Sequence, residues 1–146
     1  MQTPQDIART ATVKWEGDIA KGHGDVTTQS GKVAARYSFG TRFSGDPGTN
    51  PEELLGASHA ACFTMALSLG LTRAGHPPES LETTATVHLH RIDSGFEISK
   101  IELATNARVH GIDDERFQEI AHASKDGCPI SKALRAVPIS LSAVLS

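Results

Sequence analysis

The sequence predicts an α+β protein made of a single domain, and three observations lead to this class. Short stretches of strand-like residues fill the first third of the chain, a long helical pattern occupies residues 51–73, and two long strand-like runs follow it. Strands and helices are therefore grouped instead of alternating strictly, which is typical of α+β proteins and not of parallel α/β sheets. With 146 residues and no internal repeat or long linker, one domain over residues 1–146 is expected.

The first strands are expected over residues 10–15, 24–30 and 32–39. These segments are rich in valine, threonine and alternating apolar residues, and glycine or serine residues between them mark turns. Because the connections are short, an antiparallel meander is the natural arrangement. Residues 42–50 contain two glycines and a proline and are expected to form a loop.

The long helix over residues 51–73 has clear end signals. Asn50 suits the N-cap, Pro51 suits the first helical position, and Glu52 lies in the first turn, where the helix dipole favours a carboxylate. Gly75 and the prolines after it end the helix. Because its residues are apolar or small on nearly every face, the helix is expected at the centre of the fold or between two subunits.

The second half of the chain is expected to form two strands, two helices and a last strand, over residues 81–92, 96–109, 113–125, from 129 onward, and 137–144. Asp93-Ser94-Gly95 suits a hairpin turn between the two long strands. The alternation of the second long strand is interrupted near Ser99 and Lys100.

Charge and hydropathy exclude several classes of function. The net charge is −3 and both signs are spread along the chain, so no basic stripe for nucleic acid and no polybasic segment for a membrane is present. The longest apolar stretch, residues 60–71, is interrupted and too short to span a bilayer. Residues 1–6 lack the pattern of a secretory signal, so a cytoplasmic location without nucleic-acid or membrane partners is expected.

The two cysteines are the residues with the clearest chemical potential. Cys128 precedes a helix that begins with Pro129, so its sulfur faces unpaired backbone N–H groups that favour a thiolate. Simple packing of a small apolar residue explains it equally well. Cys62 lies in the middle of the apolar helix, where burial makes a thiol inert unless the fold supplies a cation or a hydrogen bond.

Three residues are candidates for activating Cys62. His59 precedes it by three positions and lies on the same helical face. Arg42 is a candidate cation from the preceding loop, held in place by the Glu52 carboxylate. On local evidence alone, Arg42 and Glu52 are more readily interpreted as ordinary solvated charges.

Zinc binding and cysteine hydrolysis are alternatives with less support. His59, Cys62 and Cys128 could supply three zinc ligands, but no CxxC pair and no fourth ligand accompany them. His88 and His90 share one face of a strand, which is more typical of a polar strand face than of a metal site. The sequence patterns of familiar cysteine proteases, phosphate-binding glycine loops and nucleotide fingerprints are also missing.

Taken together, the motifs resemble the OsmC branch of the OsmC/Ohr hydroperoxide reductases. The resemblance is carried by residues 41–43, 48–63 (GTNPEELLGASHAACF) and 127–131 (GCPIS), with support from residues 15–18 and 111–113. It extends over residues 13–141, and the block around Cys62 is its most specific part. The resemblance implies an intertwined homodimer, with antiparallel sheets packed around long central helices and active sites at the subunit interface.

The resemblance also implies roles for individual residues. Cys62 would be the peroxidatic thiol, Cys128 the resolving thiol, and Arg42 with Glu52 the pair that activates the thiolate. His59 would be a neighbour of the substrate site. The Ohr branch takes its arginine from a more N-terminal segment, where this chain has Lys21 and His23, so the role of Arg42 follows from membership of the OsmC branch.

The activity implied by the resemblance is that of a thiol-dependent peroxidase. It would reduce organic hydroperoxides, and hydrogen peroxide as well, through a Cys62 sulfenic acid and a Cys62–Cys128 disulfide. An external dithiol, including a lipoyl-linked one, would restore the thiols without any metal or cofactor. Such a protein would serve oxidative and osmotic stress responses. The alternative is a non-enzymatic protein of the same fold that binds a hydrophobic ligand and keeps its thiols inert.

Overall fold

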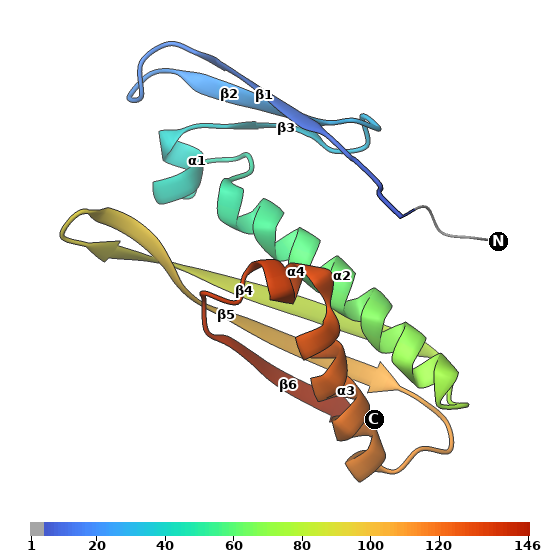
Figure 1. Ribbon diagram of the computed structural model, residues 1–146. Helices are drawn as coiled ribbons and strands as arrows, with labels where there is room; N and C mark the ends of the chain where they lie inside the picture. Colours follow the sequence, from blue (N-terminus) through green and yellow to red (C-terminus); the bar gives the residue numbers. More distant parts are fainter. Residues whose placement is uncertain (1–4) are drawn as a thin grey trace. The chain divides into compact units, whose positions relative to one another are not determined.

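The computed structural model describes residues 5–146, which divide into two compact units (Figure 1). The N-terminal unit extends to Pro51, and the C-terminal unit comprises Glu52–Ser146. Each unit contains one three-stranded sheet, and helices occur in both. The predicted α+β class is therefore confirmed, whereas a single domain over residues 1–146 stays a prediction. The expectation about residues 1–6 lies mostly outside the described residues.

The sheet of the N-terminal unit is an antiparallel meander, as the sequence predicts. Its strands, in the order β1-β2-β3, are Ala11–Glu16, His23–Thr28 and Ala34–Tyr37. Trp15 and Tyr37 meet edge to face over this sheet, with ring centroids 5.7 Å apart. Gly24 lies between them, and a Cβ at this position would come within 2.4 Å of the Tyr37 ring. A glycine at position 24 is thus required by the close approach of the two aromatic side chains.

A short helix, α1 (Phe39–Phe43), follows β3. The sequence prediction was wrong here, since it extended a strand to residue 39 and placed Arg42 in a loop. The helix begins with a reciprocal capping box. The Ser38 hydroxyl accepts a hydrogen bond from the Thr41 backbone N–H, and the Thr41 hydroxyl accepts one from the Ser38 N–H at 2.8 Å. These two bonds satisfy backbone donors that a loop would leave to water.

The elements of the C-terminal unit follow the predicted order within a few residues. They are α2 (Pro51–Arg73), β4 (Ser80–Ile92), β5 (Gly95–Arg108), α3 (Asp114–Gly127), α4 (Pro129–Ala133) and β6 (Ile139–Leu145). The Asp113 carboxylate caps α3 by accepting a hydrogen bond from the Arg116 backbone N–H at 2.8 Å. Local capping chemistry therefore sets where this helix begins.

The long hairpin of β4 and β5 contains the irregularity that the sequence indicates. Ile92 pairs with Gly95 across the turn. Farther along, His88 pairs with Lys100 and Leu89 pairs with Ile98, so Ser99 is the extra residue of a β-bulge. The predicted interruption near Ser99 is confirmed, and the bulge lets the apolar alternation resume on the correct face of the sheet.

The last strand corrects the expectation of antiparallel sheets. β6 pairs with β5 in parallel, with Ile101 opposite Ile139 and Ala107 opposite Leu145. The sheet order is β4-β5-β6, so one antiparallel and one parallel ladder share β5. A parallel neighbour needs a long crossover, and the segment that carries α3 and α4 supplies it.

The core of the C-terminal unit lies between its helices and its sheet (Figure 1). Buried side chains from α2, β5 and α3 form it together with Cys128; the large ones are Phe63, Leu67, Leu71, Leu103, Phe117 and Ile120. By length and composition alone α2 is apolar enough to cross a membrane, but the core helix of a globular protein has the same properties. The buried residues Phe63, Leu67 and Leu71 lie along one side of α2, which is typical of such a core helix.

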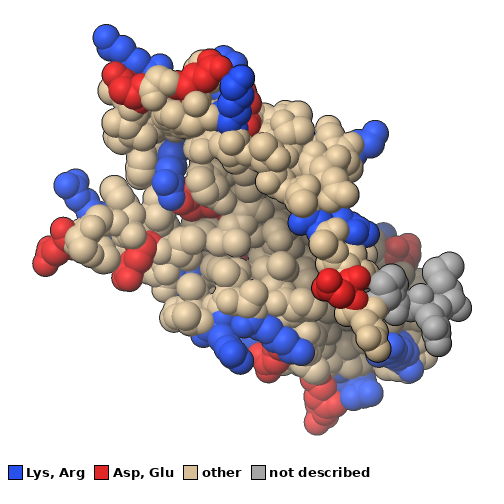
Figure 2. Space-filling view, turned by 45° about the horizontal axis from the view of Figure 1, so that its top comes forward, with Lys and Arg blue, Asp and Glu red and all other residues tan. Residues whose placement is uncertain are grey.

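Other faces of α2 are open to solvent within the chain. Met65 is 76% exposed and Leu69 is 49% exposed. The helix was expected at the centre of the fold or between two subunits, and the chain itself covers only one side of it. Charged side chains of both signs lie side by side on the face seen in Figure 2, as the composition indicates.

Candidate functional site

Cys128 occupies the junction between two helices. It is the C-cap of α3 and the N-cap of α4, and it is the single residue between the two helices. Its backbone N–H donates to the Ser124 carbonyl and its carbonyl accepts from the Lys132 N–H, both at 3.0 Å. Its side chain is completely buried and does not cap α4. The expected contact between this sulfur and the first N–H groups of α4 is therefore not formed.

Cys62 lies beside Cys128. The start of α4, which was expected to act on the Cys128 sulfur, acts on the Cys62 sulfur instead. The Cys62 thiol is half-buried and packs against the core cluster that contains Cys128, and the neighbouring Cys128 thiol raises its pKa; both cysteines are free thiols. The backbone of Ile130, in the first turn of α4, lies close enough to the Cys62 sulfur to lower its pKa. The start of α4 therefore acts on Cys62 and not on Cys128.

The environment of Cys62 favours the thiol over the thiolate. Burial raises its pKa most strongly, and the neighbouring Cys128 thiol raises it further. The Ile130 backbone lowers the pKa, because an N–H donor stabilises the negative sulfur, but this influence is smaller than that of burial. Cys62 is thus positioned for chemistry with Cys128 and still needs a positive charge to react as a nucleophile at neutral pH.

His59 and Ser131 form a second contact between the same two helices. His59 is completely buried, and its Nε2 lies 2.8 Å from the Ser131 hydroxyl oxygen. Desolvation lowers the pKa of His59, so its imidazole is neutral at physiological pH. Its other nitrogen, Nδ1, is buried without a hydrogen-bond partner among the described residues. His59, which was expected to be a neighbour of the substrate site, is a buried residue that contacts Ser131 within the chain.

Arg42 and Glu52 belong to different units of the structure. Arg42 is exposed on α1, with its guanidinium carbon 5.4 Å from the centre of the Phe43 ring. Glu52 is half-buried in the first turn of α2. On this helix Glu52 precedes Cys62 by ten residues, which corresponds to roughly 15 Å along the axis. Helical side chains also tilt toward the N-terminus, so the Glu52 carboxylate extends away from Cys62 of the same helix.

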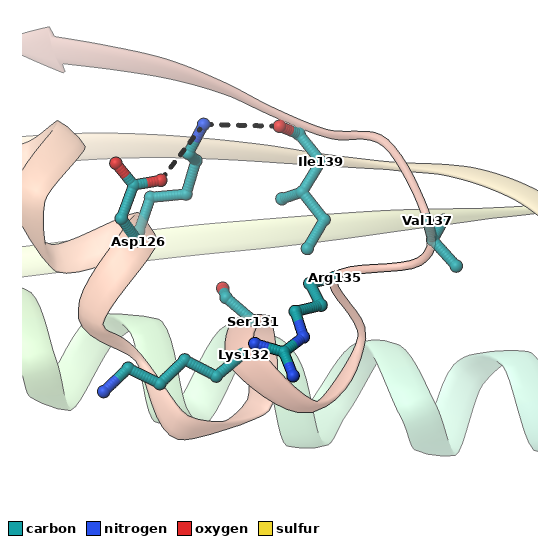
Figure 3. A pocket seen from close by; sticks show the side chains of 7 residues that line it. Asp126, Ser131, Lys132, Arg135, Val137 and Ile139 are labelled. Atoms are coloured by element: carbon teal, nitrogen blue, oxygen red, sulfur yellow. Dashed lines mark hydrogen bonds and ion pairs between the residues drawn. The ribbon is translucent and has the colours of Figure 1, made fainter.

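Three cavities of the C-terminal unit are lined by residues other than the two cysteines. The largest, about 750 Å³, runs along the exposed side of α2 and includes Ala61, Thr64 and Met65. Another, about 360 Å³, lies beside α4 (Figure 3). Its lining includes Ser131, Lys132 and Arg135, and Lys125 spans its edge by contacting Asp126 and the Ile139 carbonyl.

Metal binding gains no support from this arrangement. In the described part of the chain, residues 5–146, no three His, Cys, Asp or Glu side chains gather into a potential metal site. The Nε2 of His59 is engaged by Ser131, and His88 is hydrogen-bonded to Glu102. The zinc alternative would need ligands that these residues do not offer together.

Sequence reasoning missed Ile130 and Ser131 as parts of the site. No local pattern identifies them, because the Ser131 contact with His59 joins residues 72 positions apart in the chain.

The fold and the site together define a class of protein, an α+β domain in which a helix-borne thiol meets a second thiol at a helix junction. The model of the OsmC-like protein family matches residues 43–142. The chain is 51% identical to peroxiredoxin OsmC of Escherichia coli (strain K12), over 89% of this chain and 92% of that protein. This chain belongs to the OsmC-like family, which confirms the resemblance seen in the sequence.

Relatives on the Ohr side are more distant. The organic hydroperoxide resistance protein OhrB of Bacillus subtilis (strain 168) is 36% identical over 62% of this chain and 65% of its own length. A crystal structure of Bacillus subtilis OhrB superposes with a TM-score of 0.70, at 31% identity, covering 94% of this chain and 98% of that chain. These similarities confirm the OsmC-like fold that the sequence predicts.

Proposed function

We propose that this protein is a thiol-dependent peroxidase that reduces organic hydroperoxides, and hydrogen peroxide as well. The observation that carries the proposal is the direct contact between the Cys62 and Cys128 thiols inside an OsmC-family fold. Names of relatives, peroxiredoxin OsmC and organic hydroperoxide resistance protein, support the same chemistry.

The reaction begins with attack of the Cys62 thiolate on a peroxide oxygen. The O–O bond breaks, an alcohol or water leaves, and Cys62 becomes a sulfenic acid. Cys128 then attacks the Cys62 sulfur, the S–O bond breaks, and water leaves as the disulfide forms. The contact between the two thiols supports this step, because no large movement is needed to bring the sulfur atoms together.

A cation from a second subunit completes the site in this proposal. Burial keeps Cys62 protonated, so an arginine is needed, and Arg42 is its source. Glu52 orients Arg42 by pairing with the guanidinium. Because Glu52 and Cys62 are about 15 Å apart along one helix, a single guanidinium cannot contact both on the same α2. Arg42 and Glu52 of one chain therefore serve Cys62 of the other.

The exposed side of α2 supports a homodimer. Met65 and Leu69 project from a helix that is apolar nearly all round, and the cavity beside them is about 750 Å³. An apolar surface of this kind on a central helix is typical of a covered interface. A second copy of the chain is the partner that brings Arg42 and Glu52 to the site, with the two units of each chain acting as one OsmC-like domain.

The external dithiol reaches the disulfide through Cys62. Cys128 is completely buried, whereas Cys62 is half-buried, and exchange begins at the sulfur that an incoming thiolate can reach. The mixed disulfide forms on Cys62 and Cys128 leaves as the thiol. A small dithiol such as a lipoyl group suits this access.

The test is intact mass spectrometry after addition of one equivalent of cumene hydroperoxide to the reduced protein. We expect wild type to lose two hydrogens within seconds, Cys128→Ser to gain one oxygen as a trapped sulfenic acid, and Cys62→Ser to stay unchanged. The Cys62→Ser variant is the matched control, because it keeps the second thiol. If both thiols of wild type stay reduced in excess peroxide, the proposal is wrong, and a ligand-binding role with inert thiols replaces it.

A further inference from the structure

The His59–Ser131 contact connects the two helices that carry the cysteines. His59 precedes Cys62 by three residues on α2, and Ser131 follows Cys128 by three residues at the start of α4. The two polar contacts therefore match in reverse order, His59 with Ser131 and Cys62 with Cys128. Three residues correspond to about 4.5 Å along a helix, so the two contacts are adjacent steps between helices that run in opposite directions.

The short helix α4 cannot keep this position by itself. It has five residues, and a helix of this length is not stable without tertiary contacts. It joins α3 directly at Cys128, whose extended backbone (φ −60°, ψ 126°) breaks the helical path. The orientation of α4, and with it the place of the Cys128 sulfur, depends on the side chains that dock α4 onto α2.

One side of α4 faces a cavity, so packing on that side contributes little to holding the helix in place. The cavity of about 360 Å³ beside it is lined by Ser131, Lys132 and Arg135, as Figure 3 shows. On the inner side, Ile130 packs against the core and the Ser131 hydroxyl reaches the buried His59. The His59–Ser131 hydrogen bond is thus a buried side-chain contact that ties α4 to α2.

Loss of the His59–Ser131 hydrogen bond would also be energetically unfavourable. His59 is completely buried, and its Nδ1 has no partner among the described residues, so Ser131 supplies the one hydrogen bond of this imidazole there. Without Ser131, a buried ring would keep both nitrogens unpaired, which is strongly unfavourable. Displacement of α4 would therefore break the His59–Ser131 hydrogen bond as well as the apolar contacts of Ile130, and both losses oppose it.

We propose that His59 and Ser131 are positioning residues that hold Cys128 against Cys62, so that the sulfenic acid is resolved before a second peroxide attacks it. The proposal rests on the peroxidase function proposed above and concerns only its second step. Resolution joins the Cys128 sulfur to the Cys62 sulfur and releases water, so one thiol is oxidised and the sulfenic sulfur is reduced. In the competing reaction, a second peroxide oxidises the sulfenic acid to sulfinic acid and is itself reduced to an alcohol.

The test measures this competition directly. Reduced protein is mixed with increasing excesses of cumene hydroperoxide, quenched with a thiol-blocking reagent, and analysed by intact mass for disulfide and sulfinic acid. Over-oxidation depends on peroxide concentration and resolution does not, so the sulfinic-to-disulfide ratio rises linearly. Its slope is the ratio of the two rate constants.

In Ser131→Ala and in His59→Leu we expect the slope to rise about fivefold, in line with loss of one hydrogen bond. The slope does not depend on how fast Cys62 first reacts, because disulfide and sulfinic acid both form from the same sulfenic acid. The double variant should show no further rise, because the two residues act through one bond. His59→Gln, which keeps a polar nitrogen near the Nε2 position, should recover a slope close to that of wild type.

Ser124→Ala is the matched control. Ser124 is also a buried serine, but its hydroxyl donates to the Ile120 carbonyl of its own helix. Its loss should change thermal stability and leave the slope unchanged. The test needs only one of Ser131→Ala and His59→Leu to keep the wild-type circular dichroism spectrum. If the sulfinic-to-disulfide slope of that folded variant is unchanged, the positioning role is overturned. If wild type itself forms no disulfide, the peroxidase function fails first, which is a different result.

Discussion

The two units of this chain differ in how they use apolar residues. The C-terminal unit buries a contiguous cluster that includes Phe63, Leu67 and Phe117 at 0% exposure. In the N-terminal unit, every residue of β1 is exposed, and Val26 is the buried large apolar residue among those described. The C-terminal unit has a core of its own, whereas the N-terminal unit leaves large apolar side chains such as Val13 and Phe39 exposed.

The same division separates the chemistry. Both thiols lie in the C-terminal unit, where burial raises the pKa of Cys62, while Arg42 lies in the N-terminal unit. A thiol in an apolar core and an arginine on an exposed helix are each inert in isolation. The difference between the two units is why the function proposed for this protein depends on bringing Arg42 to Cys62.

Loss of a core aromatic side chain should have the largest effect on stability. Phe63→Ala should lower the free energy of unfolding by about 3–5 kcal/mol, because a completely buried ring leaves a cavity. Urea denaturation followed by circular dichroism measures this. Trp15→Ala is the matched aromatic truncation in the N-terminal unit, where 36% of the residue is exposed, and should cost clearly less. Equal losses would mean that the N-terminal sheet is covered as tightly as the core.

Subunit mixing tests whether the two units act across a dimer. Cys62→Ser should abolish activity, and Arg42→Ala should lower it about a hundredfold, since it removes the charge that stabilises the thiolate. If Arg42 serves the partner's Cys62, a refolded equal mixture of the two variants should recover about a quarter of wild-type turnover, because half of the dimers are mixed and each has one intact site.

The control for this mixing experiment is the double variant with both substitutions on one chain, mixed with Cys62→Ser. This mixture should recover no activity, because no dimer then contains Cys62. A mixture of Cys62→Ser and Arg42→Ala that stays inactive although it forms dimers would place both groups on one chain, contrary to the proposal.

The buried His59 should make stability depend on pH on the acid side. Burial lowers its pKa in the folded state, so below the unfolded value of about 6.5 the unfolded chain binds a proton that the folded chain does not. Stability is therefore complete above that pH and falls toward lower pH, by at most about 1.4 kcal/mol per pH unit from this group. Urea midpoints at about pH 7.5 and 5.5 measure the loss.

His59→Gln is the comparison for this pH dependence, because it keeps a polar group and cannot titrate. It should reduce the difference between the two pH values. An identical pH dependence in His59→Gln and wild type would show that other groups cause the acid destabilisation.

Helix caps should have the smallest effects, and they distinguish one folding unit from two. Asp113→Ala removes the cap of α3 and Ser38→Ala removes the capping box of α1, each worth about 1 kcal/mol. If the two units unfold together, both variants shift the same urea transition. If Ser38→Ala shifts a separate, earlier transition that Asp113→Ala leaves unchanged, the single-domain prediction is wrong.

Most secondary structure was predictable because its causes are local. Proline and glutamate residues mark the start of α2, Asp113 caps α3, and the broken alternation near Ser99 indicates the bulge. The helix α1 was missed although Ser38 and Thr41 carried a usable capping signal. The parallel pairing of β5 and β6 was missed because pairing direction depends on the path of a long crossover, which no local pattern records.

The sequence by itself determined the fold class, the order of elements apart from α1, the two cysteine motifs and the family, because caps, turns and motif residues act over a few positions. The tertiary structure decided that Cys62 contacts Cys128, that Ile130 acts on Cys62, and that His59 binds Ser131. These contacts join residues far apart in the chain, and packing of α4 on α2 creates them. The reason is physical: short-range propensities choose helices and strands, while burial and polar pairing choose which of them meet.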